Sequence, residues 1–238
     1  MPIIQHEFID WRNDEKLAKR IYEIEDNKNT PLITIEPKGE PDGQKLLEDI
    51  VSGKYDAQLN NIADVLKNSK SPVYIRFAHE MELSDLYPWG NQNPDSYIEA
   101  YRHVYTVLKS VNPANVKMVW SPAGNDGAEI YYPGDEYVDV IGVTMLHDQY
   151  WYGQESVNFY DIAASRQWVK YYQKPKWIVE FGAGHSTPEI QKNIIAQAKN
   201  EFYDYGYSAL IYLNTFDANI SGPDYRITRN SDFLPAVQ

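Results

Sequence analysis

The chain has 238 residues, of which 43% are hydrophobic, and this is enough to build a sizeable core in one large domain or two small ones. Acidic residues outnumber basic residues by 34 to 22, and the formal net charge of −12 repels phosphate backbones, so we expect no nucleic-acid partner. Cysteine is absent, which excludes disulfide bonds, thiolate metal sites and thiol nucleophiles.

The N-terminal sequence, MPIIQHEFIDW, has no basic region followed by a long apolar run, so it is not a secretory signal peptide. No stretch approaches the roughly 18–20 consecutive apolar residues of a membrane span. The protein is then either cytoplasmic or a processed or trimmed form of a longer chain. The strand count given below favours the second interpretation. We therefore expect a secreted or extracellular protein and leave a cytoplasmic location open.

Short apolar runs rich in β-branched and aromatic residues recur along the chain, and each is long enough for a strand. Several are apolar almost throughout, which is typical of parallel strands that are buried on both faces. The predicted strands are residues 2–8, 31–37, 72–80, 116–122, 138–144, 175–182 and 208–214.

Helical patterns separate most of these strands. Leu17, Ile21 and Ile24 recur at helical spacing, and Asn93-Pro94 predicts a helix N-terminus with proline in its first turn. Only the connection 122–138 is too short and too rich in Pro and Gly for a full helix. Alternating strands and helices indicate βαβ units, and seven such strands in succession favour a barrel over an open sheet.

A barrel of this type needs eight strands, and the sequence supplies seven. No linker, repeat or low-complexity segment is present. We therefore predict a single α/β domain over residues 1–238, a (β/α)8 TIM barrel that lacks strand 1 or has it truncated.

Two glutamates close predicted strands. Glu80 ends the third and Glu180 ends the sixth. In parallel barrels the side chains at the carboxyl ends of the strands converge on the active site. Retaining glycosidases need two carboxyl groups roughly 5–5.5 Å apart, one a proton donor and one a nucleophile. The alternative is that each glutamate caps a helix or pairs with an arginine, and we expect Arg76 to be an interior ion-pair partner rather than a ligand contact.

The sequence context of both glutamates resembles glycoside hydrolase family 26. The run 72–81, PVYIRFAHEM, is similar to the acid/base strand of that family, and other similar pieces follow in family order. They are residues 53–56, 87–89, 119–122, 131–135, 138–139 and 180–182. The resemblance implies a (β/α)8 barrel with the acid/base after strand 4 and the nucleophile after strand 7. Glu80 and Glu180 match those places if the chain begins at strand 2.

Several positions depart from the mannanases of that family. Glu82 and Leu83 stand where they carry Asn-Gly, and Thr144 and Leu146 stand where they carry an Asp and a Tyr that hydrogen-bonds the nucleophile. Tyr150 or Tyr212 is a possible replacement for that Tyr. A mannan substrate is therefore in doubt, and a β-glucan, a xylan or a bacterial exopolysaccharide are alternatives.

Aromatic and histidine side chains near the strand ends are candidates for sugar binding. His79 precedes the acid/base, Trp89 lies in the loop after it, and Trp120 ends the fourth predicted strand. Trp120 points either to the mouth of the barrel or into its interior. The remaining candidates are Tyr150, Trp151 and Tyr212.

The sequence thus predicts a retaining endo-β-glycanase that hydrolyses a β-linked polysaccharide by double displacement, with Glu180 as nucleophile and Glu80 as acid/base. We expect no metal and no organic cofactor. Two alternatives remain: a non-catalytic glycan-binding barrel, and a retaining hydrolase of another family in the same barrel clan.

Overall fold

A computed structural model describes residues 3–84, 86–148, 158–184, 187–213 and 225–226. In these ranges seven strands are hydrogen bonded in chain order, from β1 to β7. The pairs β1–β2, β2–β3, β3–β4, β4–β5 and β6–β7 are parallel. The chain divides into two compact units, Met1–Gly142 and Val143–Gln238, called the first and second unit below. That residues 1–238 form a single domain stays a prediction.

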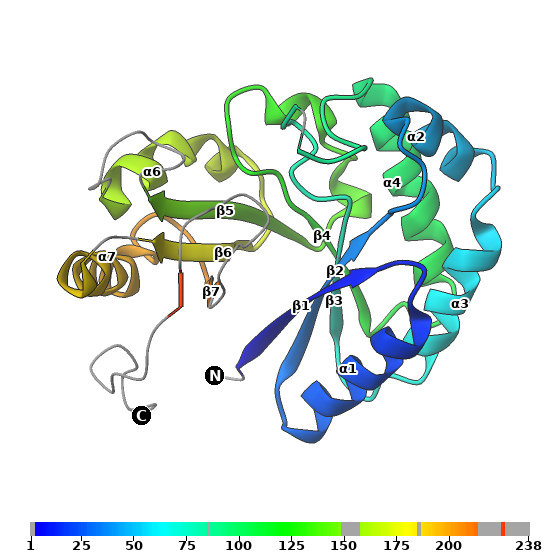
Figure 1. Cartoon of the computed structure of the whole chain (residues 1–238), viewed down its shortest axis with the longest axis horizontal. Helices are drawn as coiled ribbons and strands as arrows, with labels where there is room; N and C mark the ends of the chain where they lie inside the picture. Colours follow the sequence, from blue (N-terminus) through cyan, green and yellow to red (C-terminus); the bar gives the residue numbers. More distant parts are fainter. Residues whose placement is uncertain (1–2, 85, 149–157, 185–186, 214–224, 227–238) are drawn as a thin grey trace. The chain divides into compact units, whose positions relative to one another are not determined.

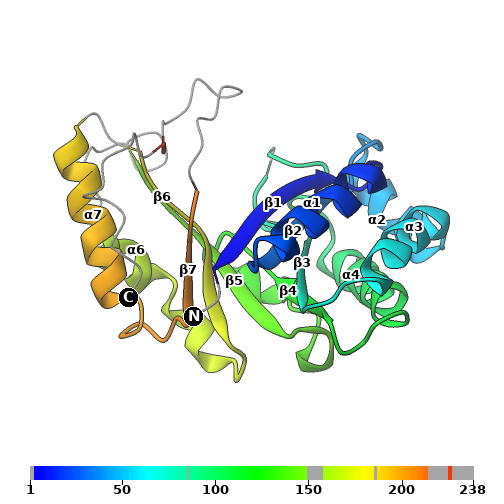
Figure 2. The same cartoon turned by 90° about the horizontal axis from the view of Figure 1, so that it is seen from below.

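The first unit alternates strands with helices. In Figure 1 and Figure 2, helices α1, α3 and α4 lie on one side of strands β1 to β4. Its elements are β1 (Ile4–Asp10), α1 (Asp14–Asp26), β2 (Thr30–Glu36), α2 (Gly43–Val51), α3 (Asp56–Lys67), β3 (Val73–Phe77), α4 (Pro94–Lys109), β4 (Val116–Trp120), and the 3-10 helices η1 (Ala128–Tyr131) and η2 (Asp135–Tyr137). The two 3-10 helices occupy the connection that was predicted to hold no full helix.

The helices of the first unit follow from their sequence pattern. Leu17, Ile21 and Ile24 form the buried face of α1. Helix α4 begins as predicted, because the Asn93 side chain accepts a hydrogen bond from the N–H of Ser96 and Pro94 occupies the first turn, where no backbone N–H is needed. The capping bonds and the apolar faces together fix where each helix starts and how it packs.

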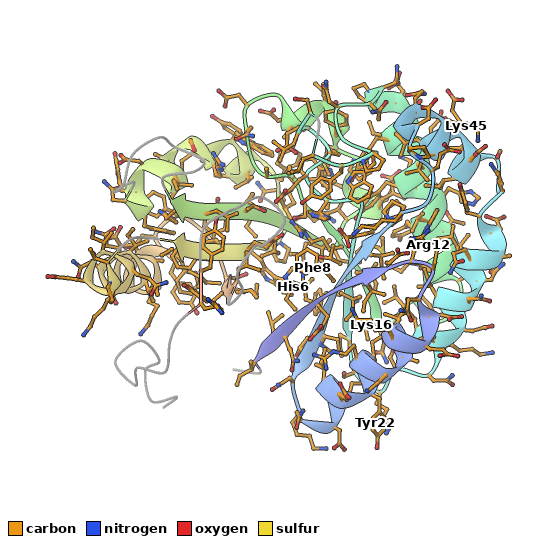
Figure 3. All side chains as sticks on the ribbon, in the orientation of Figure 1. His6, Phe8, Arg12, Lys16, Tyr22 and Lys45 are labelled. Atoms are coloured by element: carbon orange, nitrogen blue, oxygen red, sulfur yellow. The ribbon has the colours of Figure 1, made fainter. Side chains whose placement is uncertain are left out.

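Side chains of the first-unit strands alternate between two faces. Ile33, Ile35 and Ile75 are buried on one face, and Thr34 and Arg76, which are register partners in β2 and β3, lie on the other. Figure 3 shows His6 and Phe8 on the side of β1 that faces away from α1 and its labelled Lys16 and Tyr22. Phe8 is the register partner of Thr34, so polar and aromatic side chains share the face opposite the helices.

The second unit contains most of β5 and everything after it. Helices α6 and α7 lie on one side of β6 and β7 (Figure 2). The Thr187 hydroxyl caps α7 by accepting from the N–H of Ile190. The elements are β5 (Val140–Asp148), α6 (Phe159–Ser165), the 3-10 helix η3 (Gln167–Tyr171), β6 (Lys176–Gly184), α7 (Pro188–Glu201) and β7 (Ala209–Tyr212).

All seven predicted strands are present, with ends that move by a few residues. The shift that matters for the site is in β3, which ends at Phe77 and not at Glu80, because the backbone leaves the strand conformation at Ala78. Across the described ranges, no helix is both long and apolar enough to pass through a bilayer.

Candidate active site

Glu80 lies in a strained turn directly after β3. Ala78 has φ 44° and Glu80 has φ 55°, a left-handed conformation that residues with a Cβ rarely adopt. Each such residue costs about 1–3 kcal/mol and persists only where its surroundings enforce it. The turn therefore requires a set of contacts that hold it in place.

Hydrogen bonds from four different segments hold this turn. The N–H of Ala78 donates to Ile35 O on β2 at 3.2 Å, and the Tyr97 hydroxyl of α4 donates to Ala78 O at 3.3 Å. Trp89 Nε1 donates to His79 O at 2.7 Å. The N–H of Glu80 donates to Ser121 O, just past β4, at 2.8 Å. These bonds fix the position from which the Glu80 side chain leaves the backbone.

Glu80 is only 6% exposed, and its carboxyl group faces a buried cation. Arg76 Nη2 lies 3.6 Å from Glu80 Oε1, and the Tyr87 hydroxyl donates to Glu80 Oε2 at 3.4 Å. Arg76 is fully buried, and its Nε donates to Ser121 Oγ at 2.7 Å while its Nη1 donates to Thr34 Oγ1 at 3.4 Å. The expected interior ion pair of Arg76 is thus present.

His79 is buried among aromatic rings and is uncharged at neutral pH. Burial lowers the pKa of its imidazole well below the ordinary 6.5, and the nearby Arg76 charge lowers it further. Its ring centroid lies 4.6 Å from that of Tyr87 and 5.8 Å from those of Phe8 and Trp89. Within the described residues, its Nδ1 is buried and has no hydrogen-bond partner.

The two tryptophans predicted to contact sugar are both fully buried. The indole N–H of Trp89 is used by His79 O, and one ring face is stacked on Tyr87 at a centroid distance of 4.8 Å. Trp120 packs edge-on against Tyr132 at 5.0 Å, and its role in sugar binding stays a prediction. Tyr87 is only half-buried and is better placed than Trp89 to offer a ring to a ligand.

Glu180 lies inside β6 in the second unit, with four strand residues after it, and it is 7% exposed. The register between β6 and β7 shifts at this point: Ile178 pairs with Leu210, but Phe181 pairs with Tyr212. Three residues along β6 therefore span the same length as two residues along β7, so β6 contains one extra residue here. A bulge of this kind turns a side chain out of the regular alternation. Glu180 falls within it.

Tyr212 belongs to a hydrogen-bonded group beside Phe181. Its hydroxyl donates to Tyr225 O at 2.8 Å and accepts from Gln191 Nε2 at 3.4 Å. A Cβ on Gly182 would approach Tyr225 Cδ1 to 2.6 Å, so a side chain at this position requires the Tyr225 ring to shift.

Tyr150 and Trp151, the other predicted sugar contacts, lie outside the described residues. No group of three or more His, Cys, Asp or Glu side chains is arranged to hold a metal ion in the part of the chain that the structure describes.

Sequence reasoning missed Tyr87, Ser121 and Phe8, all of which border the Glu80 turn or Arg76. Tyr87 stands in the run Tyr87-Pro88-Trp89 that had been singled out, and only the more familiar tryptophan was chosen from it. Ser121 follows β4 at the same strand end as Glu80, and that position was the available signal. Phe8 gave no signal, because an aromatic residue in a strand usually belongs to the core.

Residues 39–220 match the model of glycosyl hydrolase family 26. The chain belongs to this family. The predicted resemblance is thereby confirmed, and the predicted enzyme class, glycoside hydrolase, is that of the family.

The relatives of this chain are named for different activities. Endoglucanase H of Acetivibrio thermocellus is 29% identical over 255 residues, which cover 99% of this chain and 27% of the relative. The β-1,3-xylanase TXYA of a Vibrio species is 26% identical over 140 residues, 56% of this chain and 28% of the relative. A mannan endo-1,4-β-mannosidase of Bacillus subtilis is 32% identical over 47% of this chain and 33% of its own length. The chain thus spans about a quarter to a third of these relatives.

Solved structures of the family share the fold. An endo-β-1,4-mannanase of Cellulomonas fimi aligns with a TM-score of 0.72 at 20% identity, over 93% of this chain and 56% of the other. A family 26 β-mannanase of Bacteroides ovatus aligns with a TM-score of 0.69 at 16% identity, over 97% and 76%. The prediction of a (β/α)8-barrel fold class is confirmed, with seven of its strands in the described residues.

Proposed function

We propose that this chain is the catalytic part of a retaining endo-β-glycanase that cleaves a β-linked polysaccharide. The observation that carries the proposal is the turn at Glu80. Two residues of this family 26 chain, Ala78 and Glu80, have a strained left-handed backbone that fixes one carboxyl group after the end of β3. Such strain is characteristic of functional sites, and a carboxyl group with no task in the reaction does not need it.

Glu80 serves in this proposal as the acid/base. It gives its proton to the glycosidic oxygen as the bond to the anomeric carbon breaks, and later removes a proton from the attacking water. The Tyr87 hydroxyl holds one of its oxygens by a hydrogen bond. Arg76 stabilises the carboxylate that forms after proton donation, because the positive charge lies close and is shielded from water.

Glu180 serves as the nucleophile. Its carboxylate attacks the anomeric carbon to form a glycosyl-enzyme, which water then hydrolyses with help from Glu80. The bulge in β6 supports this role, since it sets Glu180 apart from the regular alternation of a buried strand. Two displacements at one carbon leave the product with the configuration of the substrate.

A β-glucan is the first substrate to test. The match to endoglucanase H extends over 99% of this chain, whereas the mannosidase match extends over 47%. The substitutions at Glu82, Thr144 and Leu146 also argue against mannan. Xylan and bacterial exopolysaccharide remain alternatives, and the endo mode of cleavage and an extracellular location stay predictions.

The competing function is glycan binding without catalysis, on a barrel whose altered residues have lost turnover. The expected result on mixed-linkage glucan, xylan, mannan and an exopolysaccharide is release of oligosaccharides from one of them. NMR of the first product should show the substrate's anomeric configuration. Binding with no release from any of the four would favour the non-catalytic alternative, and inverted product would exclude double displacement.

A further inference from the structure

Arg76 is a buried side chain whose guanidinium nitrogens contact three different side chains. Its Nε donates to Ser121 Oγ at 2.7 Å, its Nη1 donates to Thr34 Oγ1 at 3.4 Å, and its Nη2 lies 3.6 Å from Glu80 Oε1. These partners come from the segment after β4, from β2 and from the turn after β3. The guanidinium is therefore held by two hydroxyl groups in addition to its ion pair.

The planar shape of the guanidinium makes these contacts depend on one another. Its nitrogens form a rigid fork, so the positions of two nitrogens determine the position of the third. Ser121 holds Nε and Thr34 holds Nη1, and Nη2 is then placed 3.6 Å from the Glu80 carboxyl oxygen. The two hydroxyl groups thus set how closely the cation approaches the carboxyl group.

Thr34 reaches Arg76 because of the register of the sheet. The two residues are register partners on β2 and β3, and both are fully buried on the same face. Thr34 Oγ1 also lies 2.7 Å from His6 Nε2 on β1, and this second contact restricts rotation of the Thr34 side chain. A line of polar contacts therefore runs across three neighbouring strands and ends at Glu80.

Ser121 acts on Glu80 by two routes. Its carbonyl oxygen accepts a hydrogen bond from the N–H of Glu80 at 2.8 Å, and its hydroxyl oxygen accepts one from Arg76 Nε at 2.7 Å. Ser121 is fully buried, so bulk water does not compete for its hydroxyl group. One residue thus places both the backbone of Glu80 and the cation that faces its carboxyl group.

A purely structural explanation of the two hydroxyl groups makes a different prediction. Any buried arginine needs acceptors for its N–H groups, wherever it lies in a protein. If Thr34 and Ser121 serve only that need, their loss lowers stability and has no preference for one substrate over another. If they set the position of Arg76 against Glu80, their loss affects the reactions that depend on Glu80.

We propose that Thr34 and Ser121 are positioning residues for Arg76, and that their hydroxyl groups hold its guanidinium where Nη2 faces Glu80. This inference rests on the proposed acid/base role of Glu80. A guanidinium that moves away gives less stabilisation to the carboxylate that forms during proton donation, because the attraction between buried charges falls with distance. The loss concerns only a leaving group that needs the proton.

The test compares kcat/KM of S121A and T34V on two substrates, a polysaccharide that the protein cleaves and an activated aryl glycoside. The sugar leaving group needs a proton and the aryl group does not. S121A loses the shorter hydrogen bond to a charged group, so we expect kcat/KM on polysaccharide to fall by about tenfold. T34V loses the longer bond and should fall by less. Neither variant should lose activity on the aryl glycoside.

Two variants serve as controls. T34S keeps the hydroxyl group that valine removes, so its ratio of the two rates should match that of the parent protein. Ser69 is also buried, and its hydroxyl donates to Leu66 O at 2.9 Å, but it precedes β3, at the opposite end of that strand from Glu80. S69A should therefore leave both rates unchanged. All assays are run well below the Tm of each variant, so that unfolding does not contribute.

Equal losses on both substrates in S121A and T34V would overturn the inference, as would unchanged rates in both variants. A loss in only one of them would remove the role of the other, and a loss in T34S as large as that in T34V would remove the role of Thr34. E80A is measured in parallel. If E80A keeps normal turnover of polysaccharide, the proposed function itself fails. If E80A loses turnover while S121A and T34V match the parent protein, the positioning role alone is wrong.

Discussion

Glu80 and Glu180 are held in different ways. Glu80 follows its strand, on a left-handed turn that is bonded to β2, α4, the Trp89 loop and the segment after β4. Glu180 stays within its strand and is set apart by a register shift against β7. The first arrangement surrounds a carboxyl group with a buried cation and a hydroxyl, and the second places it in a bulge within a strand. In the proposed mechanism the first carboxyl group is the acid/base and the second is the nucleophile.

The largest expected effect is that of E180A. Loss of a nucleophile removes the covalent step, so we expect kcat to fall by at least about 10⁴-fold on every substrate, whatever its leaving group. Initial rates on the polysaccharide and on an activated aryl glycoside measure this. E189Q, an exposed carboxylate in the first turn of α7, is the control. A fall confined to one of the two substrates would contradict the nucleophile assignment.

The effect of E80A should depend on the leaving group. General acid catalysis contributes about 10²- to 10⁴-fold, so we expect a loss of that size on polysaccharide. An activated aryl glycoside leaves without protonation, and its bond-breaking step should slow far less. Comparison of the two rate ratios distinguishes the glutamates. Equal losses on both substrates would remove the proposed difference between Glu80 and Glu180.

W89F tests whether the turn depends on its hydrogen bonds. The change removes the donor to His79 O and leaves a buried carbonyl unpaired, so we expect the free energy of unfolding to fall by about 1–3 kcal/mol. Chemical denaturation measures the loss. Y97F removes the longer bond to Ala78 O and should cost less. The hypothesis requires a drop in kcat in both variants, and stability loss with unchanged kcat would contradict it.

G182A tests the corresponding dependence in the second unit. An added methyl group meets the Tyr225 ring at 2.6 Å, and overpacking of this kind costs about 1–3 kcal/mol. Thermal unfolding should show a lower Tm. Combination with Y225L should restore part of the loss, because the smaller side chain makes room. Additive losses in the double variant would mean that the clash is not the cause.

The smallest expected effect concerns His79 and pH. Its folded pKa lies well below 6.5, so as the pH falls below 6.5 the unfolded chain binds a proton that the folded chain does not. Stability therefore declines on the acid side, by up to about 1.4 kcal/mol per pH unit. H79N should flatten this slope. The free energy of unfolding of H79N at pH 8, where the imidazole is neutral in both states, measures the loss of packing alone. If the stability of H79N falls between pH 6.5 and 5 as steeply as that of the parent protein, His79 is not a buried neutral imidazole.

Sequence patterns predicted the positions of all seven strands, because buried apolar runs between helical segments leave few other interpretations. They placed both glutamates at the ends of their strands, whereas Glu80 follows the end of β3 and Glu180 lies within β6, so the predicted strand end at Glu180 is wrong. They did not distinguish a turn from a bulge, since left-handed backbone at Ala78 and Glu80 arises from contacts with residues far along the chain. They also did not show that Trp89 is buried while Tyr87 is half-buried, because which of two neighbouring rings is enclosed depends on tertiary packing.

The hydrogen bonds at the Glu80 turn also determine at which stage of folding the turn forms. The turn bonds with partners that are spread over nearly ninety residues: Ile35, Trp89, Tyr97 and Ser121. Closing loops of that length costs conformational entropy, and only the contacts of a packed structure offset this cost. A peptide containing the turn alone would relax to an ordinary extended backbone. Recovery of activity after dilution from denaturant should therefore follow the docking of β4 and α4 and not the earlier formation of helices. The turn cannot be transplanted without the segments that hold it.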